Sequence, residues 1–157
     1  MNVRVTIMGV CVVAMCAMLV VGYQDLGGFS KLGLYFNQDD QGANLAYGEA
    51  NSDNVDVMLQ CAKGSRQVQL MDVASAKPNE QLVLASGAQK TALAPTVSTD
   101  ETGVTLAEAT LPVDAPVLQD FRRSGKIAVS LGGAHYGVKA RRGEQAAVSS
   151  FFTACGA

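Results

Sequence analysis

The sequence predicts an N-terminal apolar helix followed by a β-rich α+β domain, a small antiparallel sandwich or barrel of about seven strands with two short helices. Three observations predict this fold class. An apolar run occupies the N-terminus, period-two alternation recurs from residue 55 onward, and two stretches after residue 113 carry helix signals. With 157 residues, the chain has room for one domain after the apolar run.

The apolar run spans Val5–Val21, and Arg4 is the only charged side chain ahead of it. Export machinery reads a positive tip followed by such a run. Two fates remain open: a peptidase cuts after Gly22, or the segment stays uncut and anchors the protein in the membrane through residues 5–21. We therefore assign residues 1–22 as a signal-anchor or a signal peptide, and we expect the rest of the chain to be exported.

The stretch after the apolar run is rich in Gly, Asn, Asp and Gln. We interpret residues 23–54 as a linker and loosely structured lead-in to the domain. Bulky apolar residues make Lys31–Phe36 and Leu45–Gly48 candidates for short strands within it. We expect Asn37–Asn44 to be a loop.

The first clear strand has an apolar side that consists of Val55, Val57, Leu59 and Cys61. This alternation predicts a half-buried strand over residues 55–61. Residues 66–73 alternate in the same way, and the intervening Ala62–Ser65 contains a glycine suited to a turn, so the two strands are predicted to form a hairpin. Further strand candidates lie at 81–85, 90–93 and 104–111.

The first helix is predicted between Asp114 and Gly125. Asp114 is a suitable N-cap, Pro116 fits the first turn, and Gly125 fits the end. The next two segments, 126–131 and 134–139, alternate around a Gly-Gly pair and predict a second hairpin.

The last helix is predicted over Glu144–Cys155, because its apolar residues follow the helical period. Phe151 and Phe152 are adjacent on it, so one faces the core and the other is free to be exposed, and we favour core packing over a partner contact for the pair. Together with the strands, this helix completes a single domain that we place at residues 55–157.

The cysteines predict a covalent link within that domain. Cys61 and Cys155 are the only cysteines after the apolar run, and each lies on the apolar side of its predicted element. An oxidising compartment permits one pairing between them. We predict a disulfide that joins the terminal helix to the first clear strand.

Catalytic and metal-binding chemistry finds little support. The single histidine, His135, has Cys61 and Cys155 as its candidate thiol nucleophiles. The predicted disulfide oxidises both thiols, so neither is left to act as a nucleophile. Gly28–Leu32 lacks the final glycine of a nucleophile elbow. The loop that begins at Asn37 lacks the closing glutamate of a calcium loop. We expect no catalytic residue, no cofactor and no metal.

Carboxylates are no stronger as candidates. Asp39–Asp40 and Asp100–Glu101 are adjacent pairs that favour surface turns over converging acid–base groups. The net charge of −2 and the pI of about 5.3 give no electrostatic footprint for nucleic acid.

Basic residues gather near the second hairpin, and we define the basic cluster as Arg122, Arg123, Lys126, Lys139, Arg141 and Arg142. Two interpretations stay open. The cations complement the end of a helix and are solvated, or they form a surface for an acidic protein partner or anionic headgroups.

Several short motifs carry a resemblance. They are Leu45–Gly48, Ser52-Asp53 ahead of a strand ending in Leu59-Gln60-Cys61, Leu118–Gly125 after a proline, and the closing Phe151–Gly156. Together they resemble a loose group of small exported proteins of Gram-negative bacteria, to which no activity is attached. Cys61–Gly64 together with Cys155 is also similar to periplasmic lysozyme inhibitors, exported β-barrels in which a cysteine before a glycine-containing turn pairs with a late one.

These features lead to two functional expectations. The first is a non-enzymatic envelope protein, a membrane-anchored binding module or accessory subunit of a larger assembly, on the periplasmic side of the inner membrane. The alternative, implied by the second resemblance, is a secreted periplasmic inhibitor of a cell-wall lytic enzyme.

Overall fold

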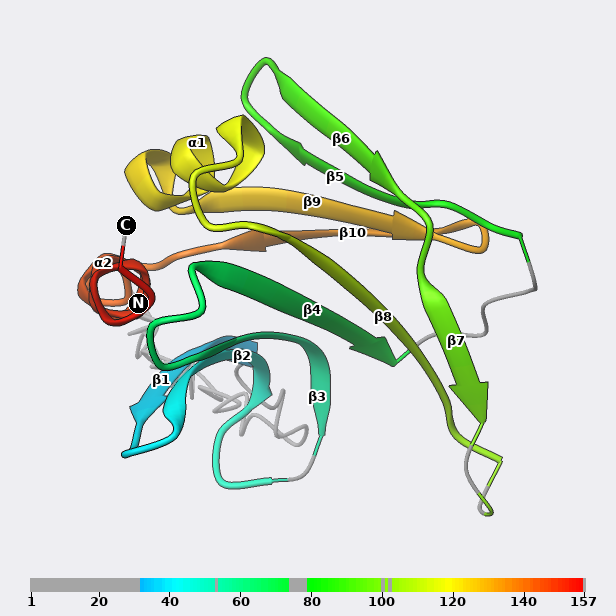
Figure 1. Ribbon diagram of the computed structural model, residues 1–157, viewed down its shortest axis with the longest axis horizontal. Helices are drawn as coiled ribbons and strands as arrows, with labels where there is room; N and C mark the ends of the chain where they lie inside the picture. Colours follow the sequence, from blue (N-terminus) through cyan, green and yellow to red (C-terminus); the bar gives the residue numbers. More distant parts are fainter. Residues whose placement is uncertain (1–31, 53, 74–78, 100, 102, 157) are drawn as a thin grey trace, which may run out of the picture.

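The computed structural model describes residues 32–52, 54–73, 79–99, 101 and 103–156. These residues form two antiparallel sheets, with two helices at one end of them (Figure 1). The strands are β1 (Leu32–Gln38), β2 (Gly42–Glu49), β3 (Val55–Ala62), β4 (Gln67–Val73), β5 (Leu82–Ser86), β6 (Gln89–Leu93), β7 (Thr96–Thr99), β8 (Thr105–Pro112), β9 (Lys126–Leu131) and β10 (Ala134–Lys139). The helices are α1 (Pro116–Ser124) and α2 (Gln145–Ala154).

The six-stranded sheet has the order β1-β2-β3-β4-β8-β7, and the four-stranded sheet has the order β10-β9-β5-β6. The predicted β-rich α+β class is confirmed. Among the described residues there are ten strands, more than the predicted number, and their pairing leaves both sheets open, so no closed barrel forms.

The predicted hairpins are confirmed by register. In β3 and β4, Leu59 faces Leu70 and Val57 faces Asp72. In β9 and β10, Val129 faces Tyr136. Directly opposed residues point to the same side of a sheet, so these registers place the alternating apolar residues on the inner face.

Part of the expected linker belongs to the six-stranded sheet. Strand β1 pairs with β2 along its whole length, and the chain turns tightly between them where a loop over Asn37–Asn44 was expected. Asp39 accepts the backbone N–H groups of Gln41 at 2.8 Å and Gly42 at 3.0 Å, which closes the turn. A side chain on Gly42 would lie 2.1 Å from the Cys61 carbonyl oxygen, so only glycine fits at this close approach.

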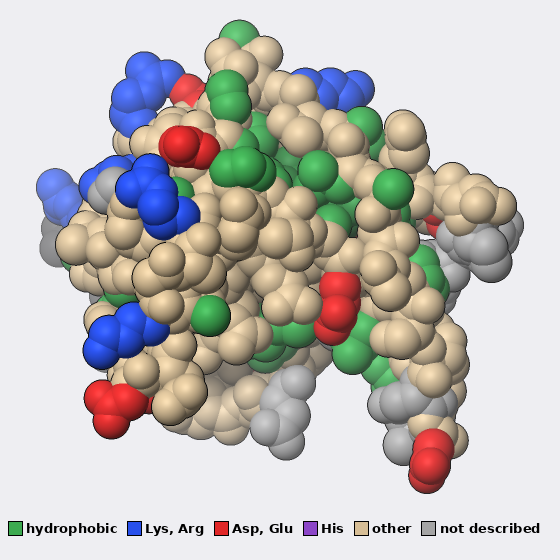
Figure 2. Space-filling view, viewed as in Figure 1, with side chains coloured by type: hydrophobic (Ala, Val, Ile, Leu, Met, Phe, Trp, Pro, Cys, Tyr) green, Lys and Arg blue, Asp and Glu red, His purple; other side chains and the backbone are tan. Residues whose placement is uncertain are grey.

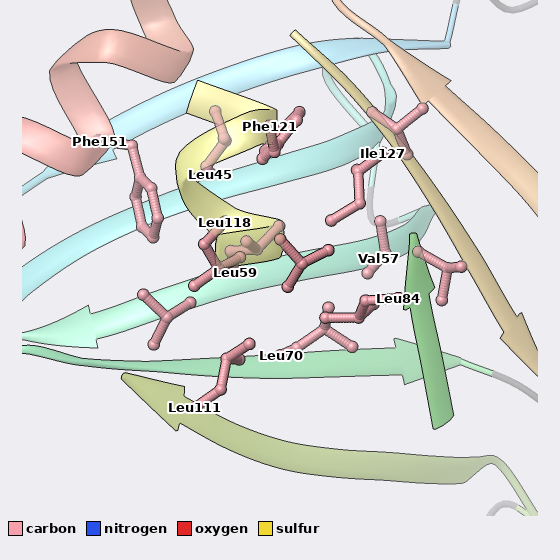
Figure 3. Packing of buried hydrophobic residues seen from close by; sticks show 14 of the residues in the cluster. Leu45, Val57, Leu59, Leu70, Leu84, Leu111, Leu118, Phe121, Ile127 and Phe151 are labelled. Carbon is pink, nitrogen blue, oxygen red and sulfur yellow. The ribbon is translucent and has the colours of Figure 1, made fainter. Parts of the chain in front are cut away.

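The core lies between the two sheets and is completed by the helices (Figure 3). Leu59 and Leu70 come from the six-stranded sheet, Leu84 from the four-stranded sheet, and Leu118 and Phe121 from α1, and all five are at most 2% exposed. One contiguous apolar cluster therefore holds the sheets and helices together.

Helix α1 begins one residue later than its predicted cap implies. Ala115 is the N-cap residue and makes no side-chain capping bond, so the expected role of Asp114 as N-cap is wrong. Asp114 instead forms an exposed ion pair in which its Oδ2 lies 3.8 Å from Arg66 Nη2. The predicted end is confirmed, because Gly125 adopts φ 66° and donates its N–H to the Phe121 carbonyl oxygen at 2.7 Å.

Helix α2 buries both of its phenylalanines, so the favoured core packing of this pair is confirmed and neither ring is exposed. Phe151 and Phe152 are each 0% exposed. The cause is tertiary: α2 packs against β1 and β2 and also against α1. The Phe152 ring stands edge-on to the Phe121 ring of α1, with 6.1 Å between the ring centroids.

The predicted disulfide is present between Cys61 on β3 and Cys155 just after α2, with a Cα–Cα distance of 5.8 Å. The apolar run at residues 1–22, with its predicted anchor or signal role, lies outside the described residues. Within the described part of the chain, no helix has the length and apolar character that a bilayer crossing requires.

Candidate partner-binding surface

The fold brings the basic cluster to one end of the molecule. Arg122 and Arg123 lie in the last turn of α1, and Lys126 opens β9 two residues later. Lys139 closes β10 directly opposite Lys126, and Arg141 and Arg142 precede α2. In Figure 2, Lys and Arg side chains gather on the side of the molecule where Figure 1 draws the two helices.

Gly125 is the point where these elements meet. Its carbonyl oxygen accepts the Ala140 N–H at 2.7 Å, which ties the end of α1 to the end of β10. The side chain of Gln145, the first residue of α2, donates to the Arg122 carbonyl oxygen at 2.7 Å. These two hydrogen bonds hold the end of α1, the end of β10 and the start of α2 next to one another, together with the cations that they carry.

Two of the six cations are held by neighbours within the chain. Arg123 pairs with the Asp120 carboxylate, and the guanidinium of Arg141 donates to the Leu32 carbonyl oxygen. The other four make no ion pair and no side-chain hydrogen bond with another described residue; these are Arg122, Lys126, Lys139 and Arg142. Most of the positive charge of the basic cluster is thus uncompensated.

Two carboxylates approach the basic cluster: Glu144 Oε2 accepts the Arg141 backbone N–H at 2.7 Å, and Asp120 pairs with Arg123. The Arg123 guanidinium, followed by the Ser86 hydroxyl, holds the pKa of the Asp120 carboxyl below its usual value, against the opposing effect of burial. The Ser86 hydroxyl lies 2.8 Å from Asp120 Oδ2 and 2.7 Å from the Lys126 carbonyl oxygen. This network connects α1 to β5 and β9 and gives the Ser–Asp pair a structural role.

Three hollows surround the cluster. The largest, of about 660 Å³, lies between α1, α2 and the β5–β6 turn, and a second, of about 480 Å³, shares Gln89, Asp120 and Arg123 with it. A third, of about 390 Å³, lies beside them over the four-stranded sheet and includes Lys126 and Lys139. Four of the six cations, Arg122, Arg123, Lys126 and Lys139, therefore line recessed surfaces and not only a convex helix end.

The structure places His135, the single histidine of the chain, on β10. His135 is exposed on the β9–β10 hairpin, and its Nδ1 lies 2.6 Å from the Ser130 hydroxyl. Both cysteines that could have served it as nucleophile are oxidised in the disulfide. No group of three His, Cys, Asp or Glu side chains converges in the part of the chain that the structure describes.

The calcium-loop-like stretch forms part of the sheet, and most of the elbow-like motif lies outside the described residues. Asn37 and Gly42 belong to strands β1 and β2, and Asp39 closes the turn between them, so this stretch is a hairpin. The Gly28-Phe29-Ser30-Lys31 part of the elbow-like motif, and Asp100 of the second acidic pair, lie outside the described residues.

Sequence reasoning missed a polar pair inside the core. Asp72 on β4 is 1% exposed, and its carboxylate lies near the buried hydroxyl of Tyr136 on β10 of the other sheet. No hydrogen bond of standard geometry joins the two groups. Burial raises the pKa of the Asp72 carboxyl, while Tyr136 acts in the opposite direction.

The same burial, followed by the neighbouring Asp72, raises the pKa of Tyr136 far above its usual range. A signal for the pair was present in the sequence, because Asp72 continues the inward alternation of Val68 and Leu70.

Known proteins give no further guide to this surface, since no family model, no curated protein and no solved structure matches the chain.

Proposed function

We propose that this chain is a non-enzymatic binding module of the Gram-negative envelope, an accessory subunit that holds an acidic protein partner on its basic cluster. It works on the periplasmic side of the inner membrane, anchored through residues 5–21 or released after cleavage. The disulfide supports an oxidising compartment, where such bonds form and persist.

The observation that carries the proposal is the opposition of Lys126 and Lys139. These side chains face each other directly across β9 and β10, and like charges in that position destabilise a sheet. Arrangements that cost local stability in this way are expected at functional sites. An acidic partner turns the repulsion into attraction, since opposite potentials across an interface steer and align binding.

The alternative role of these cations, complementing the end of α1, explains only part of the cluster. Arg122 and Arg123 lie in the last helical turn, where positive charge is favourable. Lys139 and Arg142 belong to other elements, so the helix end does not account for them. Their meeting at the Gly125 junction supports a surface that serves a partner.

Co-purification tests the proposal. The full chain is recovered from its host in mild detergent, as wild type and with Lys139→Glu plus Arg142→Glu. We expect the double variant to lose a partner that the wild type retains, and the loss to be reproduced by raised salt. Lys63→Glu, a reversal in the exposed β3–β4 turn, is the control and should retain the partner. Equal retention by the double variant contradicts the proposal.

Fractionation with N-terminal sequencing tests the anchoring. An anchored protein remains in the membrane fraction with an intact N-terminus. A soluble product starting near Tyr23 contradicts anchoring and leaves a secreted module.

Inhibition of a cell-wall lytic enzyme is the second candidate. The turn after Cys61, with Gly64 at φ 73°, and the link to Cys155 support it, because the lysozyme inhibitors share this arrangement. The open sheets of the described residues differ from the barrel of that family. A lysozyme-inhibition assay with the purified chain separates the candidates, since the first proposal expects no inhibition.

A further inference from the structure

The two sheets carry opposite charges. Strands β5, β6, β9 and β10 contain three lysines and neither Asp nor Glu; the lysines are Lys90, Lys126 and Lys139. The strands of the six-stranded sheet contain four acidic residues and neither Lys nor Arg; the acidic residues are Glu49, Asp56, Asp72 and Glu108. The four-stranded sheet is therefore the positive side of a molecule whose net charge is −2.

The lysines lie on the outer face of that sheet. The inner residues of β5 and β9 are Leu84, Ile127 and Val129, all buried in the core. Lys126 and Ala128 alternate with them and so point outward, as do Lys139 and Gly137 on the neighbouring strand. Helix α1 contributes Leu118 and Phe121 to the inner side, so among the described elements no helix covers the outer face.

Across the middle of this face runs a row of very small residues. Lys90 is paired with Ala85, Ala85 with Ala128, and Ala128 with Gly137, so one register row crosses all four strands. Three of these residues line the hollow of about 390 Å³; they are Ala85, Ala128 and Gly137. We call this row the sheet trough. Apart from Lys90 at its β6 end, the row carries no side chain larger than a methyl group.

Lysines border the trough on two sides. Lys90 stands at its β6 end, and the next outward row toward α1 is formed by Lys126 and Lys139. With strands about 4.8 Å apart, the three spacings from Lys90 across to Gly137 give roughly 14 Å, which is about ten residues of an α-helix, and the floor of small residues takes up two of these spacings. The trough therefore has the length and charge to accept one short acidic segment.

We infer that the sheet trough is the docking site for a short acidic helical segment of the partner protein. The inference rests on the proposed function and names where and how the partner is held. The small floor lets a helix backbone approach closely, and the bordering lysines meet its carboxylates at one end and along one side. A flat lipid surface does not reach a recessed floor, which favours a peptide over anionic headgroups.

A peptide titration tests this inference. The probe is a fluorescently labelled, helix-forming peptide of alternating Glu and Ala blocks, added to the full chain in mild detergent and followed by anisotropy. Ala128→Leu fills the floor without changing charge and should weaken binding about tenfold. Lys90→Glu should weaken it by a similar factor. A Lys/Ala peptide of equal length should not bind.

Matched variants make the result specific. Ala46→Leu places the same bulk on an alanine of β2 in the other sheet and should leave binding unchanged, and thermal melts should show all variants folded. If Lys139→Glu weakens binding but Ala128→Leu and Lys90→Glu do not, the sheet trough is not the docking site, while partner binding by the basic cluster is supported. If none of these variants weakens binding, both fail.

Vesicle binding and self-association test the two other occupants of the outer face, a lipid surface and a second copy of the chain. Binding of vesicles containing phosphatidylglycerol with the same sensitivity to Ala128→Leu, or self-association that this variant abolishes, overturns the peptide assignment.

Discussion

Cys61 and Cys155 are bonded across a sequence separation of 94 residues, and the bond joins a central strand of the six-stranded sheet to the end of the last helix. Helix α2 is otherwise held by packing against β1, β2 and α1. The disulfide thus fixes the helix that carries one side of the recessed basic surface.

Replacing both cysteines by alanine should lower the free energy of unfolding by roughly 4–5 kcal/mol. The disulfide closes a long loop and so restricts the unfolded chain, and its removal gives that conformational entropy back to the unfolded state. Urea denaturation of the wild type and of Cys61→Ala with Cys155→Ala measures this. A loss below about 1 kcal/mol would show that packing alone holds α2.

Asp72→Asn should stabilise the protein at neutral pH by about 1–3 kcal/mol, because it removes a buried charge that lacks a well-formed hydrogen bond. The pKa of Asp72 is raised in the folded chain, so the stability it contributes is complete below the ordinary Asp pKa of about 4 and is lost as pH rises through the folded pKa. The advantage of the variant should therefore grow with pH and vanish in acid.

Tyr136→Phe tests the other member of the buried Asp72–Tyr136 pair. It removes the hydroxyl that favours the charged form of Asp72, so it should raise the pKa of that carboxyl further and destabilise the protein at neutral pH. Adding Asp72→Asn should cancel much of this pH dependence. Identical pH profiles for all three variants would contradict the account of the pair.

Asp120→Asn should have the opposite pH dependence. Arg123 and Ser86 lower the pKa of Asp120, so the stability it contributes is present above the ordinary Asp pKa and is lost as pH falls through the folded pKa. The variant should be destabilised at neutral pH and approach the wild type in acid. Denaturant titrations of the two Asn variants in one pH series check both signs, and parallel curves would refute them.

Gly125→Ala should destabilise the junction by more than the 1–2 kcal/mol typical of a left-handed non-glycine residue. Its φ is 66°, and an added Cβ would lie 2.8 Å from Ala140 Cβ. Gly64→Ala is the matched control, because φ there is 73° and nothing lies within 4 Å. Thermal melts that show equal losses for both would contradict the crowding at the junction.

The fold was predictable where the pattern is local. Alternation located the β3–β4 and β9–β10 hairpins, and Gly125 marked the end of α1. Strand β7 has four residues and only one apolar position, so it carries no usable pattern and is defined by its pairing with β8. Both phenylalanines of α2 are buried because α2 fits between a sheet and another helix, which no periodicity within α2 reveals.

The candidate site was predictable in part. The basic cluster was visible because its residues are close in sequence, and the opposition of Lys126 and Lys139 follows from the hairpin register. The hollows depend on the β5–β6 turn meeting α1, through Ser86 and Asp120. The sheet trough depends on the pairing of Ala85 with Ala128. Such long-range contacts are fixed by the assembled core and not by any local signal.

Photo-crosslinking at Ser149 tests the central claim most directly. Ser149 is exposed and lines the largest hollow together with Arg122 and Arg123, so a photoreactive amino acid placed there in the full chain reports on any partner bound to the basic cluster. In intact cells we predict one protein adduct that is missing from the same substitution at Lys63 and is lost when Lys139→Glu and Arg142→Glu are added. No adduct at Ser149, or an adduct that survives the double charge reversal, would contradict the account.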